Sequence, residues 1–200
     1  MIILGLTGSI GMGKSTTARM FADAGIPVHD ADATVHALYR GPAATLIEQR
    51  FPGTVIDGVV DRKRLGAAVI GKPEEMKALE ALVHPLVREA ETSFLARARD
   101  SHKPLVVLDI PLLFETGGDC RTDAAVVVTA SAGIQRARVL ARPGMSEETL
   151  AALMAKQMPD REKRARAHFL VDSSFGMEPA RRQVEGIIRA AAGMAGKTGR

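Results

Sequence analysis

The sequence predicts a doubly wound α/β domain, built on a parallel five-stranded sheet flanked by helices. Its apolar, β-rich runs are unbroken rather than alternating, which is typical of strands buried on both faces. Helical stretches separate the runs, as crossover helices separate the strands of a parallel sheet. The five predicted strands, of which the last is the weakest, are residues 2–6, 26–29, 105–109, 124–129 and 169–172.

The composition indicates one globular domain that is poorly supplied with surfaces for stacking nucleic-acid bases. Of 200 residues 46% are hydrophobic and 25% charged, which is ordinary for a soluble enzyme. With no Trp and one Tyr the chain has few surfaces on which nucleic-acid bases could stack, and no apolar run approaches membrane-spanning length. Cys120 is the only cysteine, which fits a cytoplasmic location. We expect no nucleic-acid or membrane partner, and a monomer or weak homo-oligomer.

Two helical segments interrupt the strand pattern. We divide a single domain of residues 1–200 into a core (1–31, 101–130 and 167–192), a helical acceptor-binding insertion (about 32–100), a helical lid (about 131–166) and a frayed tail (193–200). The net charge of +4 is uneven, because residues 121–200 alone carry +6. A basic half of this kind can mean an RNA or membrane surface or a site that closes over phosphates, and charge alone does not choose between them, since most such arginines simply solvate helix faces.

A phosphate-binding motif follows the first predicted strand and opens a predicted helix. It has the form Gly8-x-x-x-x-Gly13-Lys14-Ser15, the P-loop. Its glycines allow the backbone N–H groups to surround an anion, and the helix N-terminus adds a favourable dipole. We expect Lys14 to reach the β- and γ-phosphates of ATP and the Ser15 hydroxyl to bind Mg²⁺.

Three classes of enzyme share this loop: small-molecule kinases, switch GTPases, and ATPases that act on nucleic acid or protein. The chain contains no Asn, so the Asn-Lys-x-Asp sequence that reads guanine is missing in its usual form. A kinase needs a carboxylate beside the phosphates and an arginine-bearing lid. Both are present, and we favour the kinase class.

Three aspartates are candidates for the carboxylate. Asp30 and Asp32 lie at the carboxyl end of the second predicted strand, at the sheet edge where ligands of open parallel sheets bind. One of them can cap the following helix while the other holds or deprotonates an acceptor hydroxyl, and we favour Asp32 for the chemistry. Asp109 ends the third strand and is either a Mg²⁺ ligand, through water, or an ordinary turn residue.

The lid arginines lie in residues 135–142. Arg138 and Arg142 are four residues apart and share a helix face, and guanidinium groups suit bidentate contacts with phosphate. Pro143 and Gly144 follow and predict a helix break and a hinge. We favour Arg142 as the catalytic arginine, with Arg138 as a second ATP contact.

Taken together, these motifs resemble the dephospho-coenzyme A kinase family. The resemblance covers about residues 2–190 and is most specific in the motifs beyond the loop. In chain order the matching pieces are residues 6–16, Asp30-Ala31-Asp32 with His36, Asp61-Arg62 with Leu65, Leu79-Glu80, His84-Pro85, 108–115, 135–142, Gln157-Met158 and 163–167.

The resemblance implies transfer of the γ-phosphoryl group of ATP to the ribose 3′-hydroxyl of dephospho-CoA, the last step of coenzyme A synthesis. It assigns catalysis to Asp32, Lys14 and Arg142. The remaining implied contacts are with ATP (Gly8, Gly11, Met12, Gly13, Lys14, Ser15, Thr16, Arg138 and Arg142), with the acceptor (Asp32, His84, Arg88 and Glu115) and with Mg²⁺ (Ser15 and Asp109).

The chain departs from the family pattern at two places. His168 stands where the family often has Asp, and Ser173 where it often has Asn, in a segment expected near the adenine pocket. The selectivity for the nucleotide base therefore stays open. Another small-molecule or nucleoside monophosphate kinase, and a non-catalytic nucleotide-sensing module, remain the alternative functions.

Overall fold

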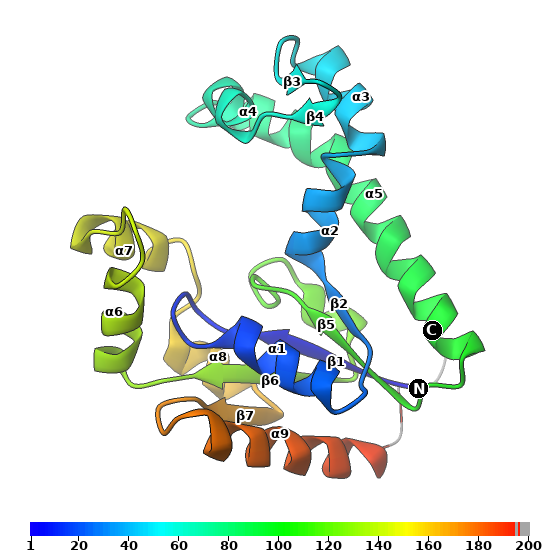
Figure 1. Ribbon diagram of the computed structural model, residues 1–200, viewed down its shortest axis with the longest axis vertical. Helices are drawn as coiled ribbons and strands as arrows, with labels where there is room; N and C mark the ends of the chain where they lie inside the picture. The colour runs from blue at the N-terminus through cyan, green and yellow to red at the C-terminus, as the bar shows by residue number, and fades with distance from the viewer. Residues whose placement is uncertain (195, 197–200) are drawn as a thin grey trace. The chain divides into compact units, whose positions relative to one another are not determined.

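The computed structural model describes residues 1–194 and 196. The described residues form two compact units, the first made of Met1–His29 and the described residues from Ala98 onward, and the second of Asp30–Arg97. Of the tail expected at 193–200, residues 195 and 197–200 lie outside the described residues. The first unit holds the sheet and the phosphate-binding loop, and the second holds the insertion (Figure 1).

The first unit contains the predicted five-stranded sheet, which confirms the fold class. Its strand order is β2-β5-β1-β6-β7. β1 lies at the centre and pairs in parallel with β5 and β6, and β6 pairs in parallel with β7. The strands are β1 (Ile2–Thr7), β2 (Val28–Asp30), β5 (Leu105–Asp109), β6 (Ala124–Thr129) and β7 (Phe169–Asp172).

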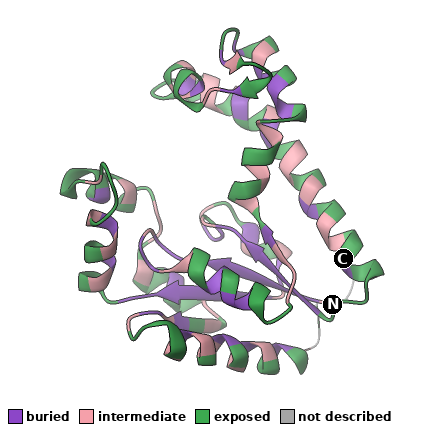
Figure 2. Cartoon of the chain, in the orientation of Figure 1, coloured by how far each residue is buried: buried purple, intermediate pink, exposed green. Residues whose placement is uncertain are grey.

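Unbroken apolar runs place the three middle strands, β5, β1 and β6, in the interior, as Figure 2 shows by burial. Every residue of β1, β5 and β6 is buried. One core cluster joins alternate strand residues, such as Leu4 and Leu6, to the apolar faces of α1 (Lys14–Asp23) and α9 (Met177–Ala192). Parallel strands covered by helices therefore account for the missing alternation in the sequence.

The region expected as a lid contains three short helices, each started by a recognisable signal. They are α6 (Ala132–Leu140), α7 (Glu147–Met154) and α8 (Asp160–Arg166). The side chains of Ser131 and Ser146 accept hydrogen bonds at the N-termini of α6 and α7, and Pro159 precedes α8. A short 3₁₀ helix, η1 (Gly118–Arg121), precedes β6.

The second unit is mostly helical, with its own apolar core that includes Ile47, Phe51 and Val83. Its helices are α2 (Ala31–Leu38), α3 (Pro42–Arg50), α4 (Arg62–Val69) and α5 (Pro73–Asp100), the last continuing into the first unit.

The second unit also contains a hairpin that the sequence analysis did not predict. Its strands β3 (Val55–Ile56) and β4 (Val59–Val60) pair antiparallel. Asp57 and Gly58, between them, have φ angles of 49° and 77°. Positive φ at both central residues is typical of the tight turn that an Asp-Gly pair favours. The sequence therefore carried the signal, but two-residue strands were too short to stand out.

No helix in the described part of the chain is both long and apolar enough to span a membrane.

Candidate active site

The phosphate-binding loop, residues 8–13, joins the central strand β1 to α1. The register of the sheet places Leu6 of β1 opposite Asp109 at the end of β5. The loop therefore begins beside Asp109, at the carboxyl edge of the sheet and between the two strands that flank β1. This is the position where ligands bind in open parallel sheets.

The backbone of the loop presents a cluster of donors. Among the described residues, no hydrogen bond uses the N–H groups of Gly11, Gly13, Lys14, Ser15 or Thr16. The last three open α1, where the first N–H groups of a helix have no intrahelical partner. Consecutive unpaired amides at a helix N-terminus form an anion site with a favourable dipole, so the loop can bind phosphate groups.

The motif glycines are required by the packing behind the loop or by the backbone conformation. A Cβ on Gly8 would lie 2.7 Å from the Val128 carbonyl oxygen, and one on Gly11 would lie 2.6 Å from Val139 Cγ2. Gly11 and Gly13 also have φ angles of 79° and 91°, which L side chains rarely adopt. Larger residues would push the loop away from the sheet and from α6.

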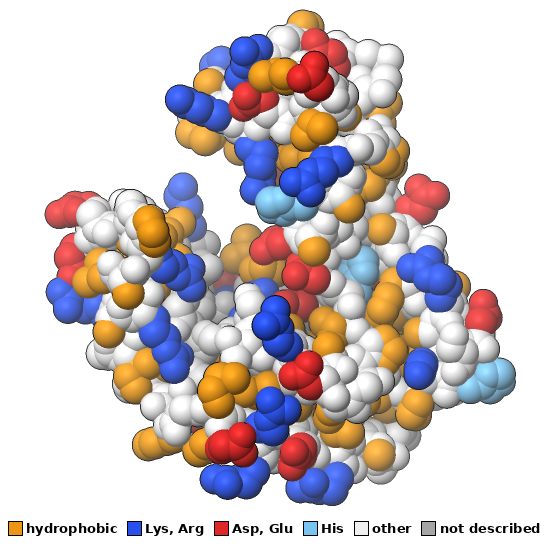
Figure 3. Space-filling view, viewed as in Figure 1, with side chains coloured by type: hydrophobic (Ala, Val, Ile, Leu, Met, Phe, Trp, Pro, Cys, Tyr) orange, Lys and Arg blue, Asp and Glu red, His pale blue; other side chains and the backbone are white. Residues whose placement is uncertain are grey.

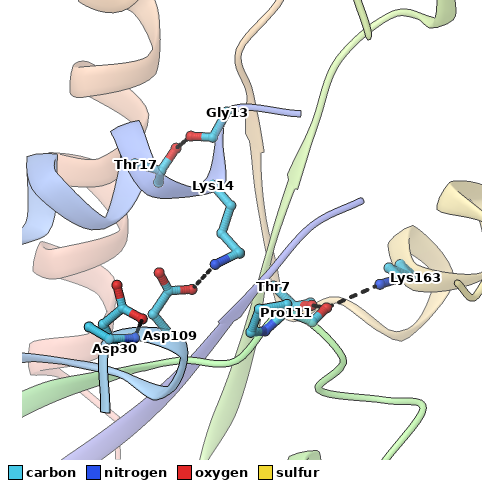
Figure 4. A network of polar contacts seen from close by, with 9 residues as sticks. Thr7, Gly13, Lys14, Thr17, Asp30, Asp109, Pro111 and Lys163 are labelled. Carbon is cyan, nitrogen blue, oxygen red and sulfur yellow. Dashed lines mark hydrogen bonds and ion pairs between the residues drawn. The ribbon is translucent and has the colours of Figure 1, made fainter. Parts of the chain in front are cut away.

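Lys14 and Asp109 form an ion pair beside the loop, as Figure 4 shows. Lys14 Nζ lies 2.7 Å from Asp109 Oδ1, and the two side chains are 15% and 2% exposed. The pair keeps the ammonium group of Lys14 at the start of α1, close to the unpaired amides. The bond also shows that the buried Asp109 carboxylate is a partner of the loop lysine.

The residues expected to bind Mg²⁺ offer the oxygen donors that this ion prefers. Ser15 is exposed in the first turn of α1, and Asp109 lies at the neighbouring strand end. The described residues contain no cluster of three or more His, Cys, Asp or Glu that could hold a metal ion. Mg²⁺ in phosphoryl-transfer sites is bound by one or two protein groups together with phosphates and waters, and this donor set fits that pattern.

Asp30 and Asp32 differ in their contacts. Asp30 is the N-cap of α2, and its Oδ1 accepts a hydrogen bond of 2.9 Å from the N–H of Ala33. Asp32 is exposed in the first turn of α2, and its side chain has no hydrogen bond or ion pair among the described residues. Of the two roles considered for this pair, the structure assigns the cap to Asp30. The catalytic role of Asp32 stays a prediction.

His84 and Arg88, expected near the acceptor, lie on α5 within the second unit. They are four residues apart and both exposed, so they lie on the same face of the helix. Pro85 lies inside this helix, directly after His84. Their contact with an acceptor is not tested by the structure.

The three arginines of α6 and its C-terminal turn have different surroundings. Arg136 pairs with Glu147 of α7, and Arg138 donates to Ser173 after β7. Arg142 is exposed, and its side chain has no partner in the described part of the chain. In Figure 3, Lys and Arg side chains are visible over the α6 and α7 segment. Arg142 therefore has a guanidinium group available to a ligand.

Arg138 and Ser173 stabilise the phosphate-binding loop through a chain of hydrogen bonds. Arg138 donates to Ser173 Oγ (2.8 Å) and to the Ser173 carbonyl (2.9 Å). Ser173 Oγ in turn donates to the Met12 carbonyl at 2.8 Å. The Met12 carbonyl and the Gly13 N–H belong to one planar trans peptide group and point in opposite directions. Because the Met12 carbonyl points toward Ser173, the N–H of Gly13 points away from Ser173. Ser173, where the family often has Asn, thus contacts the loop itself, and the ATP contact expected of Arg138 stays a prediction.

His168, the second departure from the family pattern, joins the start of β7 to β6. Its backbone N–H donates to the Ala125 carbonyl at 2.9 Å, and its Nδ1 accepts from the Ala125 N–H at 3.2 Å. Both bonds extend the pairing of the two strands. The described contacts of His168 are therefore structural.

Glu115 forms a buried ion pair that the sequence analysis did not anticipate. Its Oε1 lies 2.9 Å from Nζ of Lys163, a lysine with no exposed surface, and accepts a hydrogen bond from the Met158 N–H. Burial opposes ionisation of Glu115, but the bonds from Lys163 and Met158 outweigh it and hold the pKa of this carboxyl below its usual value. The ion pair connects α8, at the end of the lid region, to the segment that follows β5. The acceptor contact expected of Glu115 is not tested by these bonds.

Two glutamines also reach the loop and were missed as site residues. Gln135 donates to the Ile10 carbonyl, and Gln157 accepts from the Ile10 N–H. These contacts join residues 125 and 147 positions apart, so no local pattern could reveal them.

Comparisons with known proteins agree over nearly the whole chain. A family model described as dephospho-CoA kinase matches residues 2–178. A protein of Mesorhizobium japonicum named dephospho-CoA kinase is 63% identical over 188 residues, which are 94% of this chain and 95% of the relative.

Solved structures give the same picture. The crystal structure of TT1252 from Thermus thermophilus is similar with a TM-score of 0.84 and 39% identity, over 94% of this chain and 96% of that one. A dephospho-CoA kinase from Campylobacter jejuni shares the fold, with a TM-score of 0.66 and 22% identity over 94% of this chain and 96% of that one.

Proposed function

The chain belongs to the dephospho-CoA kinase family, and from this membership we infer that it phosphorylates the ribose 3′-hydroxyl of dephospho-CoA with ATP. This reaction is the last step of coenzyme A synthesis. The enzyme is a phosphotransferase with an alcohol group as acceptor. The structural observation that carries the inference is the set of unpaired loop amides with Lys14 beside them, because it supplies a phosphate site at the edge of a kinase-type sheet.

We propose that ATP is the phosphoryl donor and that the loop binds its phosphates. The unpaired amides of Gly11 and of residues 13–16 would surround the β-phosphate, and Lys14 would neutralise charge between the β- and γ-phosphates. Lys14 is paired with Asp109 in this structure, so binding of the nucleotide would require the ammonium group to share or exchange that partner.

Ser15 and Asp109 would hold Mg²⁺, Ser15 directly and Asp109 through water. When bound, the ion would neutralise part of the charge that develops on the phosphate oxygens. The exposed hydroxyl of Ser15 and the carboxylate of Asp109 supply donors of the right chemistry.

Asp32 would orient the 3′-hydroxyl and accept its proton. In the transfer the bond from the γ-phosphorus to the ADP oxygen breaks, a bond from that phosphorus to the 3′-oxygen forms, and the hydroxyl proton passes to the carboxylate. Because Asp30 is engaged as the cap of α2, Asp32 is the aspartate of the pair whose carboxylate remains available. His84, Arg88 and Glu115 are proposed acceptor contacts.

Arg142 would stabilise the transferring phosphoryl group. It follows α6, next to a turn in which Gly144 has a φ of 75°, and its side chain is unpaired among the described residues. A mobile guanidinium group at such a position can approach the phosphates when the lid closes. Arg138, tied to Ser173, is a second proposed ATP contact.

An ADP-release assay over a panel of acceptors tests the function. We expect ADP formation with dephospho-CoA and ATP in the presence of Mg²⁺, and little with nucleosides, nucleoside monophosphates or shikimate. Phosphorylation of another acceptor in preference to dephospho-CoA would identify a different small-molecule kinase. ATP binding without turnover of any acceptor would indicate a nucleotide-sensing module.

A further inference from the structure

Side chains from outside the phosphate-binding loop bind its backbone at Ile10, one residue before Gly11, whose N–H is among the unpaired amides described above. Gln135 Nε2 donates to the Ile10 carbonyl at 2.8 Å, and the Ile10 N–H donates to Gln157 Oε1 at 3.1 Å. Gln135 comes from α6 and is 4% exposed, while Gln157 follows α7 and is half-buried. Two side chains thus satisfy both backbone groups of a single loop residue.

These bonds determine which way the neighbouring amides point. The Ile10 carbonyl and the Gly11 N–H belong to one planar trans peptide group and point in opposite directions. By holding the carbonyl from the side of α6, Gln135 directs the Gly11 N–H away from that helix. The Ser9–Ile10 peptide is fixed in the same manner, because the Ile10 N–H is bound to Gln157 and the Ser9 carbonyl accepts from the Met12 N–H at 3.1 Å.

We propose that Gln135 and Gln157 are positioning residues for the phosphate site, which set the orientation of the loop amides through Ile10. Neither residue needs to touch ATP for this role. Their positions also mean that the two ends of the segment 136–156, which includes α7, meet at one residue of the loop. The proposal rests on the kinase function, since it concerns how the same loop binds a nucleotide.

Gln135 is the donor in its hydrogen bond to Ile10, whereas Gln157 is the acceptor in its own. This difference in role can be tested by substitution. A backbone carbonyl only accepts and a backbone N–H only donates, so Gln135 must present its amide nitrogen and Gln157 its amide oxygen. Replacing Gln by Glu retains an acceptor and removes the donor. Gln135→Glu would therefore set two acceptors against each other, whereas Gln157→Glu would keep the bond from the Ile10 N–H.

The experiment measures the dissociation constant for Mg·ADP by titration calorimetry, without an acceptor, for both Glu variants and for Gln135→Met and Gln157→Met. Both Glu variants add one negative charge beside Ile10, so both repel the nucleotide to a similar extent. This repulsion cancels in the ratio of their two dissociation constants, and the ratio therefore reports the effect of the hydrogen bond to Ile10. We expect Gln135→Glu to bind Mg·ADP roughly tenfold more weakly than Gln157→Glu does. The two Met variants each lose one hydrogen bond to Ile10, so we expect them to bind Mg·ADP more weakly than the wild type and about equally well as each other.

Gln49→Glu, on an exposed face of α3 (Pro42–Arg50), serves as the control for added charge and should bind Mg·ADP as the wild type does. A ratio below about threefold between the two Glu variants, or a reversed ratio, overturns the proposal. A lowered melting temperature with unchanged Mg·ADP binding in the Met variants does so too, because it would show a structural role only. If Gln135→Glu fails to fold, the uncharged Gln135→Met decides: weaker Mg·ADP binding than in the wild type supports the proposal, and unchanged binding contradicts it. A wild type that does not bind Mg·ADP would instead contradict the proposed function.

Discussion

Lys14 Nζ lies 2.7 Å from Oδ1 of Asp109, and this ion pair links the start of α1 to the end of the neighbouring strand β5. The Asp109 side chain is 2% exposed. A carboxylate so deeply buried depends on its partners, because burial without a counter-charge is costly. The lysine of the loop therefore has a structural partner in addition to its expected role at the phosphates.

We expect Lys14→Met to abolish turnover and also to lower stability, by about 1–3 kcal/mol, because it removes the cation beside a buried carboxylate. The sequence alone gives Lys14 no part in stability, and the ion pair adds this second effect. The double variant Lys14→Met with Asp109→Asn should recover most of the stability and none of the turnover. Steady-state assays and thermal melts of both variants would check this, and an active Lys14→Met enzyme would contradict the role of the loop.

The sheet and the loop could be predicted because their signals are local. Unbroken apolar runs identified the five strands, and a glycine pattern between a strand and a helix identified the phosphate site. The expected boundaries of the strands at 105–109, 124–129 and 169–172 match the observed ones. Strand β2 is less regular and begins two residues later than expected, at Val28.

The contacts that hold the site were not predictable, because they join distant residues. In the sequence Lys163 is one of several basic residues in an arginine-rich helix, and nothing there distinguishes it from its neighbours. In the structure its side chain is fully buried and pairs with Glu115. Gln135 and Gln157 lie in segments expected to form a lid, and only the folded chain brings both to Ile10. Side-chain contacts with the backbone have no periodicity, so no pattern in the sequence reports them.

Substitutions of Asp30, the last residue of β2, and of Asp32, in the first turn of α2, should have different effects. We expect Asp32→Asn to lower kcat by about 10²-fold or more with little change in the KM for ATP, because it removes a positioned acid–base group. Asp30→Ala should keep most of kcat and lower stability by about 1 kcal/mol, because it removes the cap of α2. Kinetics and thermal melts would distinguish these effects. The larger kcat defect in Asp30→Ala would mean that the catalyst and the cap are exchanged.

The pair of Glu115 and Lys163 predicts a pH-dependent contribution to stability. The pKa of Glu115 is lower in the folded chain than its ordinary value of 4.5, so its ionised form favours folding. That contribution is fully present above about pH 4.5 and is lost as the pH falls through the depressed pKa.

Glu115→Gln should therefore lower the melting temperature at pH 7.5, because Lys163 is left buried without its carboxylate partner. A loss of about 3 kcal/mol, roughly 5–10 °C, is expected. The difference from wild type should shrink in melts below pH 4. Glu162→Gln, an exposed substitution on the same helix as Lys163, is the control. A difference that stays constant between pH 7.5 and pH 3.5 would show that ionisation of Glu115 contributes nothing.

Arg142 is expected to act on the transferring phosphoryl group more than on bound ATP. ATP and dephospho-CoA are both anionic, and the proposed Asp32 carboxylate adds to the negative charge that transfer must overcome. A guanidinium group that closes onto the phosphates contributes most in the transition state, so Arg142→Ala should lower kcat by a larger factor than it raises the KM for ATP. Arg142→Lys should recover only part of the loss, since Lys lacks the planar fork that binds two oxygens at once.

The matched control is Arg181→Ala on α9, a half-buried arginine that forms only a long ion pair of 3.9 Å with Asp23. It removes the same charge from the basic half of the chain without touching the α6–α7 turn. Steady-state kinetics of the three variants, with both substrates varied, would separate the two explanations. An equal defect in Arg181→Ala and Arg142→Ala would reduce the effect to net charge. Wild-type kcat in Arg142→Ala would leave this arginine as part of a solvated surface, and the closing cation would then have to be sought among the other arginines of the lid.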